Sequence, residues 1–281
     1  MSAHLTLQQF AMLAAMVHSA PSFGTGMPLP ELLQVLRGYL DEAKIYRQEV
    51  AFDMVAALAQ LCANLAGEVN DVTVLTGEFM DQDTAIQKAL DSKNHLTCFL
   101  LSTNLLYLGY MVQDHLMAEQ HALLSRKLLW AVKPAYVCVQ HVFLDGLNAA
   151  KLSRVQLGGQ RRKQLRLVRK CLRMLTKASA HAPHSCLHKA HLLGAELDAA
   201  TGRFDAALWK YKLSTALSRS DGFMQVEALG YELFAETLLD RRRFDDARRH
   251  IRQSCALNVK WGCNLKVDHL NRKLTEVRGA N

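Results

Sequence analysis

A block of residues recurs at a fixed distance in the second half of the chain, and this repeat restricts the possible folds more than any other feature. Ala195-Glu196, followed by Gly202-Arg203-Phe204-Asp205-Ala206-Ala207, returns as Ala235-Glu236 followed by Arg242-Arg243-Phe244-Asp245-Asp246-Ala247, with an offset of 40 residues. Each block predicts an apolar helix, a short turn that carries an aromatic residue, and a second helix that opens with small residues. A single hairpin of this kind cannot bury its apolar face alone, so repeated hairpins are expected to stack and share one core.

The same pattern extends upstream in a less regular form. Gln113-Asp114-His115, with Ala118 and Ala122, fits the template, and Gly158-Gly159-Gln160 falls where a further turn is expected. We therefore predict turns near residues 114, 159, 203 and 243. Strand signals are scarce, and the 15 Gly and 5 Pro residues gather where turns are expected. The sequence predicts an all-α protein.

A spacing of 40 to 45 residues with this pattern resembles the tetratricopeptide superfamily with lengthened helices. The resemblance implies helical-hairpin repeats stacked as a right-handed solenoid. The alternative is a globular all-α bundle that contains two similar hairpins. Trp130, Trp209 and Trp261 are interpreted as packing residues, and Gly262 is predicted to end a helix.

We predict a single helical-repeat domain over residues 1–281. It comprises an irregular N-terminal part (1–27), an irregular first unit (28–90), four helix pairs (91–133, 134–180, 184–220 and 224–262) and a terminal helix (263–281). Residues 29–66 fit one long helix or two abutting ones. The terminal helix either caps the stack or leads into a further domain.

Charge is concentrated between residues 146 and 195, where eleven Lys or Arg occur and no Asp or Glu. The chain has a net charge of +8, so the remainder carries −3. Leu165, Val168, Leu172 and Leu175 recur on one helical face of this segment, and cations occupy the other positions. The predicted partner-binding residues are Arg161, Arg162, Lys163, Arg166, Arg169, Lys170 and Arg173.

A basic amphipathic helix of this kind fits three environments. It can be a solvated outer face whose long side chains cover apolar surface, a site for an acidic protein, or a site for anionic lipid or nucleic acid. The segment from 146 to 195 contains no aromatic residue on which single-stranded bases could stack. Among ligands, the sequence therefore favours an acidic protein partner over nucleic acid or a membrane surface.

Several histidines lie near the C-terminal end of this segment. His184, His188 and His191 share one helical face, at a spacing that suits metal ligands. No carboxylate between residues 146 and 195 could orient their imidazole rings, and the neighbouring cations oppose a divalent ion. We therefore interpret them as surface or turn-packing residues, and expect no metal, no cofactor and no small-molecule substrate.

Catalytic motifs do not stand out. Cys138 and His141 are neighbours on a predicted helix, but their apolar surroundings indicate a core thiol with a raised pKa. The seven cysteines form no CxxC pair and are typical of reduced thiols in a cytoplasmic protein. No phosphate-binding loop or protein-kinase motif is present. The most apolar run, residues 97–112, is shorter than the ~20 residues that span a bilayer, so we expect a soluble protein without a transmembrane segment.

Several motifs in order carry a more specific resemblance. They are Leu-Thr-Gly-Glu-Phe at 75–79, Asp-Gly-Phe at 221–223, Glu-Ala-Leu at 227–229 and Lys-Trp-Gly at 260–262, within the segments 26–67, 75–83, 187–208, 219–248 and 258–270. This series resembles the helical segment of large multidomain signalling kinases. That segment lies between a serine/threonine-kinase-like domain with a predicted ATPase domain and a GAF sensor with a histidine-kinase module. The resemblance implies a helical connector, and none of the family's catalytic residues has a counterpart here.

The sequence thus predicts a non-catalytic protein–protein interaction scaffold or connector. Its concave groove is expected to be lined by Asn104, Gln140, Asn148, His191 and Glu232. The alternative is a regulatory segment of a signalling kinase whose catalytic domains lie outside this chain. A further alternative is a protein that binds anionic lipid or nucleic acid through its basic helix. Apolar faces at the two ends of the stack would allow self-association.

Overall fold

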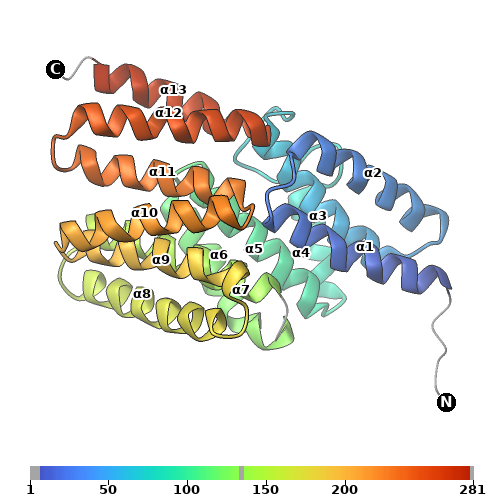
Figure 1. Cartoon of the computed structure of the whole chain (residues 1–281). Helices are drawn as coiled ribbons and strands as arrows, with labels where there is room; N and C mark the ends of the chain where they lie inside the picture. The colour runs from blue at the N-terminus through green and yellow to red at the C-terminus, as the bar shows by residue number, and fades with distance from the viewer. Residues whose placement is uncertain (1–6, 133–135, 279–281) are drawn as a thin grey trace.

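The computed structural model describes residues 7–132 and 136–278, and most of these residues are helical, with no strand among them (Figure 1). The longest connection between helices is residues 67–81. The elements are α1 (Leu7–Gly24), α2 (Leu29–Ile45), α3 (Glu49–Ala66), α4 (Gln82–Asp91), α5 (His95–Met111), α6 (His115–Leu128), the 3₁₀ helix η1 (Leu129–Val132), α7 (Tyr136–Val155), α8 (Gly158–Ser179), α9 (Pro183–Ala200), α10 (Phe204–Ser220), α11 (Met224–Leu239), α12 (Phe244–Trp261) and α13 (Asn264–Arg278). The predicted all-α class is confirmed.

Neighbouring helices pack in pairs along the chain. The most extensive contacts join α5 to α6, α7 to α8, α9 to α10, and α11 to α12, and the first helices of successive pairs also contact one another. Breaks between paired helices fall at residues 112–114, 156–157, 201–203 and 240–243. The turn expected near residue 159 is thus earlier, because Gly158 and Gly159 begin α8 instead of forming the turn.

The repeat in the sequence corresponds to a repeat in the packing of the last two pairs. The Ser214 hydroxyl donates a hydrogen bond to the His188 carbonyl oxygen at 2.8 Å, and the Ser254 hydroxyl donates to the Ala228 carbonyl oxygen at the same distance. Donors and acceptors are each offset by 40 residues. The small residues of the repeat are fully buried in both pairs: Ala195, Ala207, Ala235 and Ala247. Small side chains at these positions let the paired backbones approach closely.

The N-terminal region contains more regular structure than predicted. Residues 29–66 form two helices, α2 and α3, separated by a turn in which Arg47 has a left-handed φ of 51°. The part predicted to be irregular, 1–27, contains α1 over most of its described length. Its apolar run from residue 10 to 17 favours a helix, and α1 ends three residues after Pro21, which cannot donate a backbone hydrogen bond to the preceding turn.

Residues far apart in sequence join the N-terminal helices to the C-terminal ones. The Trp261 indole Nε1 donates to the Met27 carbonyl oxygen at 3.2 Å, and the Asn264 amide donates to the Ala66 carbonyl oxygen at 2.8 Å. The Gln225 amide donates to the carbonyl oxygens of Phe23 and Gly24. These hydrogen bonds hold α1–α3 against α11–α13.

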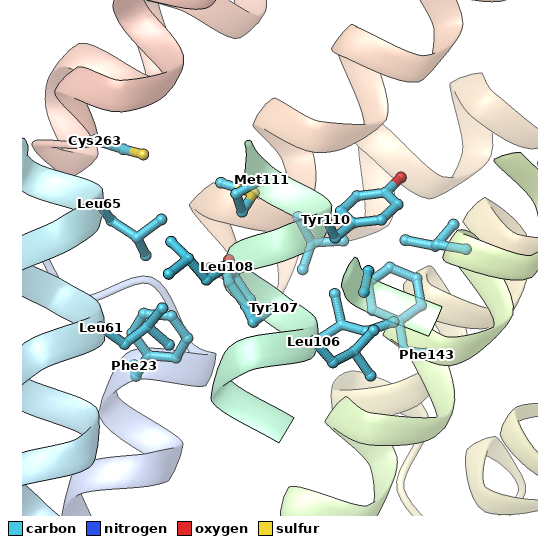
Figure 2. Packing of buried hydrophobic residues seen from close by; sticks show 14 of the residues in the cluster. Phe23, Leu61, Leu65, Leu106, Tyr107, Leu108, Tyr110, Met111, Phe143 and Cys263 are labelled. Atoms are coloured by element: carbon cyan, nitrogen blue, oxygen red, sulfur yellow. The ribbon is translucent and has the colours of Figure 1, made fainter. Parts of the chain in front are cut away.

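Helix α5 lies at the centre of the core and is buried on several sides. Figure 2 shows Leu108 and Met111 facing Leu65 of α3 and Cys263, while Leu106 faces Phe143 of α7. The helix therefore has no solvent-facing stripe over most of its length, as expected for a helix that is apolar on all sides.

The three tryptophans occupy different environments. Trp261 is buried, with its ring centroid 5.9 Å from that of Phe23, and Gly262 ends its helix with a left-handed φ of 81°, as predicted. Trp130 and Trp209 are 64% and 60% exposed, so their interpretation as packing residues is wrong. They lie on outer faces, where each contacts one histidine ring.

We expect Trp261→Ala to reduce the free energy of unfolding by about 3–5 kcal/mol, because it empties a buried site and removes the hydrogen bond to Met27. Trp209→Ala is the matched control and should change the free energy of unfolding by less than ~1 kcal/mol, since the Trp209 ring is mostly in solvent. Urea unfolding followed by circular dichroism measures both. Equal losses in the two variants would contradict the role given to Trp261.

Candidate interaction surface

Helix α8 carries the basic segment along one edge of the molecule (Figure 1). One side packs against α7 and α9 through buried side chains, which are Gln164, Leu165, Val168, Cys171 and Leu175. The opposite side bears exposed cations in two adjoining rows. The arginine row comprises Arg162, Arg166, Arg169 and Arg173, and the lysine row comprises Lys163, Lys170 and Lys177.

The arginine row is not neutralised within the protein. No ion pair formed by residues 7–132 and 136–278 involves any of its four guanidinium groups. Arginines on other helices do have partners: Arg126 lies 2.9 Å from Asp145, and Arg154 lies 3.2 Å from Glu196. The positive charge of the arginine row is therefore available to an external anion.

Arg161 was predicted to belong to the same binding surface, but its guanidinium is used inside the protein. It donates to the Ser153 carbonyl oxygen at 3.2 Å and to the Ala200 carbonyl oxygen at 2.8 Å. These acceptors lie near the C-terminal ends of α7 and α9, where carbonyl groups lack helical partners. Arg161 thus fixes the start of α8 to both neighbouring helices.

A shallow open hollow lies within the arginine row. Its volume is about 360 Å³, and it is lined by Arg162, Leu165, Arg166 and Arg169. Leu165 is 7% exposed, so it contributes an apolar floor, and three charged side chains surround it. The surface can therefore contact an apolar atom and several anionic groups at once.

Two of the five residues predicted to line a concave groove are buried inside the protein. Asn148 is fully buried and exchanges hydrogen bonds with the His115 side chain and backbone at 3.0 and 3.1 Å. Glu232 is 2% exposed and lies 2.8 Å from the ammonium nitrogen of Lys266 on α13. Assigning these two residues to a partner-binding groove is wrong, because neighbouring helices already satisfy them.

The other three groove candidates remain partly exposed, but the structure does not bring them together. Asn104, Gln140 and His191 lie on α5, α7 and α9, and no hydrogen bond in the described part of the chain joins any two of them. The His191 ring lies edge-on to Trp209, with the centroids 6.3 Å apart. They do not form a shared site.

A largely buried ion network links α7 to α9, α11 and α13, and sequence reasoning missed it. Lys151 on α7 and Lys273 on α13 both pair with Glu236 on α11. Burial opposes ionisation of Glu236, but the two ammonium groups outweigh it and hold the pKa of this carboxyl well below its usual range. Arg154 of α7 pairs with the buried Glu196 of α9 at 3.2 Å. Glu196 and Glu236 occupy equivalent positions in the repeat, and this recurrence is the sequence feature from which the network could have been predicted.

The three histidines considered as metal ligands face different partners. His184 is exposed, with Nδ1 2.8 Å from the Asp221 carboxylate. His188 is buried, and its ring centroid lies 4.3 Å from that of Phe223. His191 contacts Trp209 instead. Over residues 7–132 and 136–278, no group of three or more His, Cys, Asp or Glu side chains is arranged to hold a metal ion.

Cys138 and His141 do not face each other either. The Cys138 thiol donates to the Val132 carbonyl oxygen at 3.4 Å, whereas His141 Nδ1 lies 3.2 Å from the Ser125 hydroxyl.

Two other cysteines lie in the core. Burial raises the pKa of the Cys171 and Cys263 thiols to about 12, so both remain protonated at neutral pH.

Lys189 is a buried cation that the sequence did not reveal. Its side chain is fully buried, and its ammonium nitrogen lies 4.3 Å from the centroid of Phe223 and 5.6 Å from that of Tyr136. It donates to the Ser185 carbonyl oxygen at 2.8 Å and lies 3.1 Å from His188 Nε2. Burial lowers the pKa of Lys189 to about 7. Within the described residues no carboxylate pairs with it.

No protein-family model matches the chain, and no curated protein matches it.

Among the described residues, one helix, α3, is long and apolar enough to cross a bilayer by length and composition, and 67% of that stretch is buried inside the protein.

We expect Lys189 to make stability depend on pH. Its pKa is lower in the folded state than the usual value near 10.5, so the unfolded state binds more protons above pH 7 and this lysine makes stability rise with pH by up to ~1.4 kcal/mol per unit. Lys189→Met should be more stable than the original protein at pH 7, and the difference should shrink by pH 8.5. Urea unfolding at both pH values measures this.

Lys177→Met is the control for that experiment, because Lys177 is exposed on α8. The Lys189 ammonium group also lowers the pKa of the nearby Cys186 thiol, so the difference between Lys189→Met and the original protein reports on this lysine together with that thiol. A constant difference between Lys189→Met and the original protein over this pH range would show that burial does not perturb the lysine.

Proposed function

We propose that this chain is a non-catalytic protein–protein interaction scaffold, built as a right-handed solenoid of tetratricopeptide-like hairpins. Two observations support the architecture. Paired helices follow one another along the chain, and the pairs α9–α10 and α11–α12 share equivalent buried alanines and equivalent hydrogen bonds from Ser214 and Ser254. Stacked pairs of this kind present broad, rigid surfaces on which partners dock.

The arginine row of α8 is the observation that carries the proposed function. Four exposed guanidinium groups lie on one helix face and form no ion pair with residues 7–132 or 136–278, and Arg161 fixes that helix to α7 and α9. Unneutralised charge on a rigid element accelerates association with a partner of opposite charge. We therefore assign the row to an acidic protein partner, bound on the outer face instead of in the groove predicted from sequence.

The groove face supports this choice of surface. Asn148 and Glu232 are buried and paired, and the ion network around Glu236 occupies the space between α7, α11 and α13. A partner that entered there would have to separate buried charges, at a cost of several kcal/mol. The seven cysteines, four of them buried, suit a reducing cytoplasmic location for the scaffold.

A regulatory segment of a multidomain signalling kinase is the second candidate, and the placement of the shared motifs favours it. In the 75–79 motif, the Phe79 backbone N–H donates to Gln60 Oε1 at 3.1 Å. The Asn64 amide donates to the Val74 carbonyl oxygen, directly before the motif, at 2.7 Å. The 260–262 motif supplies Trp261 and Gly262, which hold α12 against the N-terminal helices. These roles are structural, as a connector requires.

Charge reversal on α8 tests the proposed function. We expect Arg162→Glu, Arg166→Glu and Arg169→Glu combined to reduce recovery of co-purifying proteins at least about tenfold, because attraction to an acidic partner becomes repulsion. Quantitative mass spectrometry of nuclease-treated purifications measures the loss. Nuclease treatment separates direct protein binding from bridging by nucleic acid.

The matched control reverses exposed cations on other helices: Arg252, Lys260 and Arg272 combined, each to Glu. It changes the net charge of the chain by the same amount and should retain the partners. If the original protein retains no protein that the α8 variant loses, the scaffold proposal fails. If anionic vesicles or RNA are retained through α8 instead of a protein, the lipid or nucleic-acid alternative replaces it.

A further inference from the structure

The arginine row combines positive charge with a regular helical spacing. Arg162, Arg166, Arg169 and Arg173 succeed one another at intervals of four, three and four residues. At 1.5 Å per residue the row is about 16 Å long. A partner helix that lies alongside α8 presents side chains at the same spacing, so its carboxylates would meet the guanidinium groups one by one.

The choice of arginine favours carboxylate recognition along this row. A guanidinium group donates two parallel hydrogen bonds to one carboxylate and is more weakly hydrated than an ammonium group. The lysines are set apart in their own row. Burial raises the pKa of Asp145 on α7 to about 6, and Arg126 and, to a smaller extent, Lys170 oppose this rise. The arginine row therefore provides the directional contacts, and the lysine row adds general positive potential.

The hollow at Leu165 adds an apolar position to the row. Its floor is the Leu165 side chain and its rim is formed by Arg162, Arg166 and Arg169, whose methylene stems extend the apolar surface. An apolar side chain between two carboxylates of a partner helix would fill this hollow and exclude water from the surrounding ion pairs. A phosphate backbone projects no such group, and Leu165 is too deeply buried to enter a bilayer.

Building on the proposed function, we infer that the arginine row binds an acidic amphipathic helix of a partner protein, with an apolar side chain of that helix seated over Leu165. The row is already held in place by the packing of Val168 and Leu175 and by the two hydrogen bonds of Arg161. Such preorganisation reduces the conformational cost of binding on the side of this protein.

A designed helical peptide tests the inference on the full chain. The peptide carries Glu at the spacing of the arginine row and one Leu between the central Glu residues, and its affinity is measured by fluorescence anisotropy. Replacing that Leu by Ala in the peptide should weaken binding about fivefold, since one buried apolar contact is lost. A scrambled peptide of identical composition should bind at least about tenfold more weakly, because its carboxylates fall out of register.

Variants of the protein separate shape from charge. Arg162→Lys, Arg166→Lys and Arg169→Lys combined keep the charge but lose the paired hydrogen bonds, and should weaken binding of the designed peptide several-fold. The combined Glu variants of the same three residues should abolish binding, whereas the Arg252, Lys260 and Arg272 reversal should preserve it. Thermal unfolding confirms that each variant remains folded.

Three results would overturn the inference. Equal affinities for the designed and scrambled peptides would mean that only net charge matters, and the scaffold proposal would still stand on its co-purification test. An unchanged affinity after the peptide Leu is replaced would exclude the role of the hollow. Tighter binding of an RNA oligonucleotide or of phosphatidylserine vesicles, lost in the α8 Glu variant, would assign the row to a different anion.

Discussion

Carboxylates on α9 and α11 that are largely withdrawn from solvent must be matched by cations from other helices, and this requirement ties the successive helix pairs together. Glu236 pairs with Lys151 from α7 and with Lys273 from α13, and Glu196 pairs with Arg154. Removing one partner of a buried pair costs about 3–5 kcal/mol, because a charge is left without compensation. The network therefore fixes where α7 and α13 can lie relative to α11, even where its net contribution to stability is small.

The protein consequently separates its cations into two populations. Lys151, Arg154, Lys266 and Lys273 neutralise carboxylates between the helices, whereas the arginine row of α8 pairs with no carboxylate in the part of the chain that the structure describes. The first population closes the face on which tetratricopeptide-like proteins are expected to hold peptides. The second leaves a row of exposed positive charge on the outer edge of α8. This distribution of charge is why we propose that a partner binds the outer face of α8 and not a groove.

Much of the helical architecture could be predicted because short-range patterns determine it. The repeat around Ala195 and Ala235 located two hairpins, and Gly262 was recognisable as a helix end because glycine adopts a positive φ without strain. The pairing of Glu232 with Lys266, the burial of Lys189 and the exposure of Trp130 depend on which helices become neighbours. Periodicity assigns a face to a residue but does not say what lies opposite, so groove residues and ion partners could not be distinguished.

The position of α8 relative to the shared motifs bears on specificity. The segments on which the resemblance to signalling kinases rests lie at 26–67, 75–83, 187–208, 219–248 and 258–270, and none of them includes α8. Their residues form internal turns and contacts between the chain's distant helices, such as Trp261 against Met27 and Phe79 against Gln60. A scaffold can retain such residues while one exposed helix changes, because substitutions on a solvent-facing row leave the core packing intact. The arginine row is therefore where selectivity for a partner can arise without altering the fold that presents it.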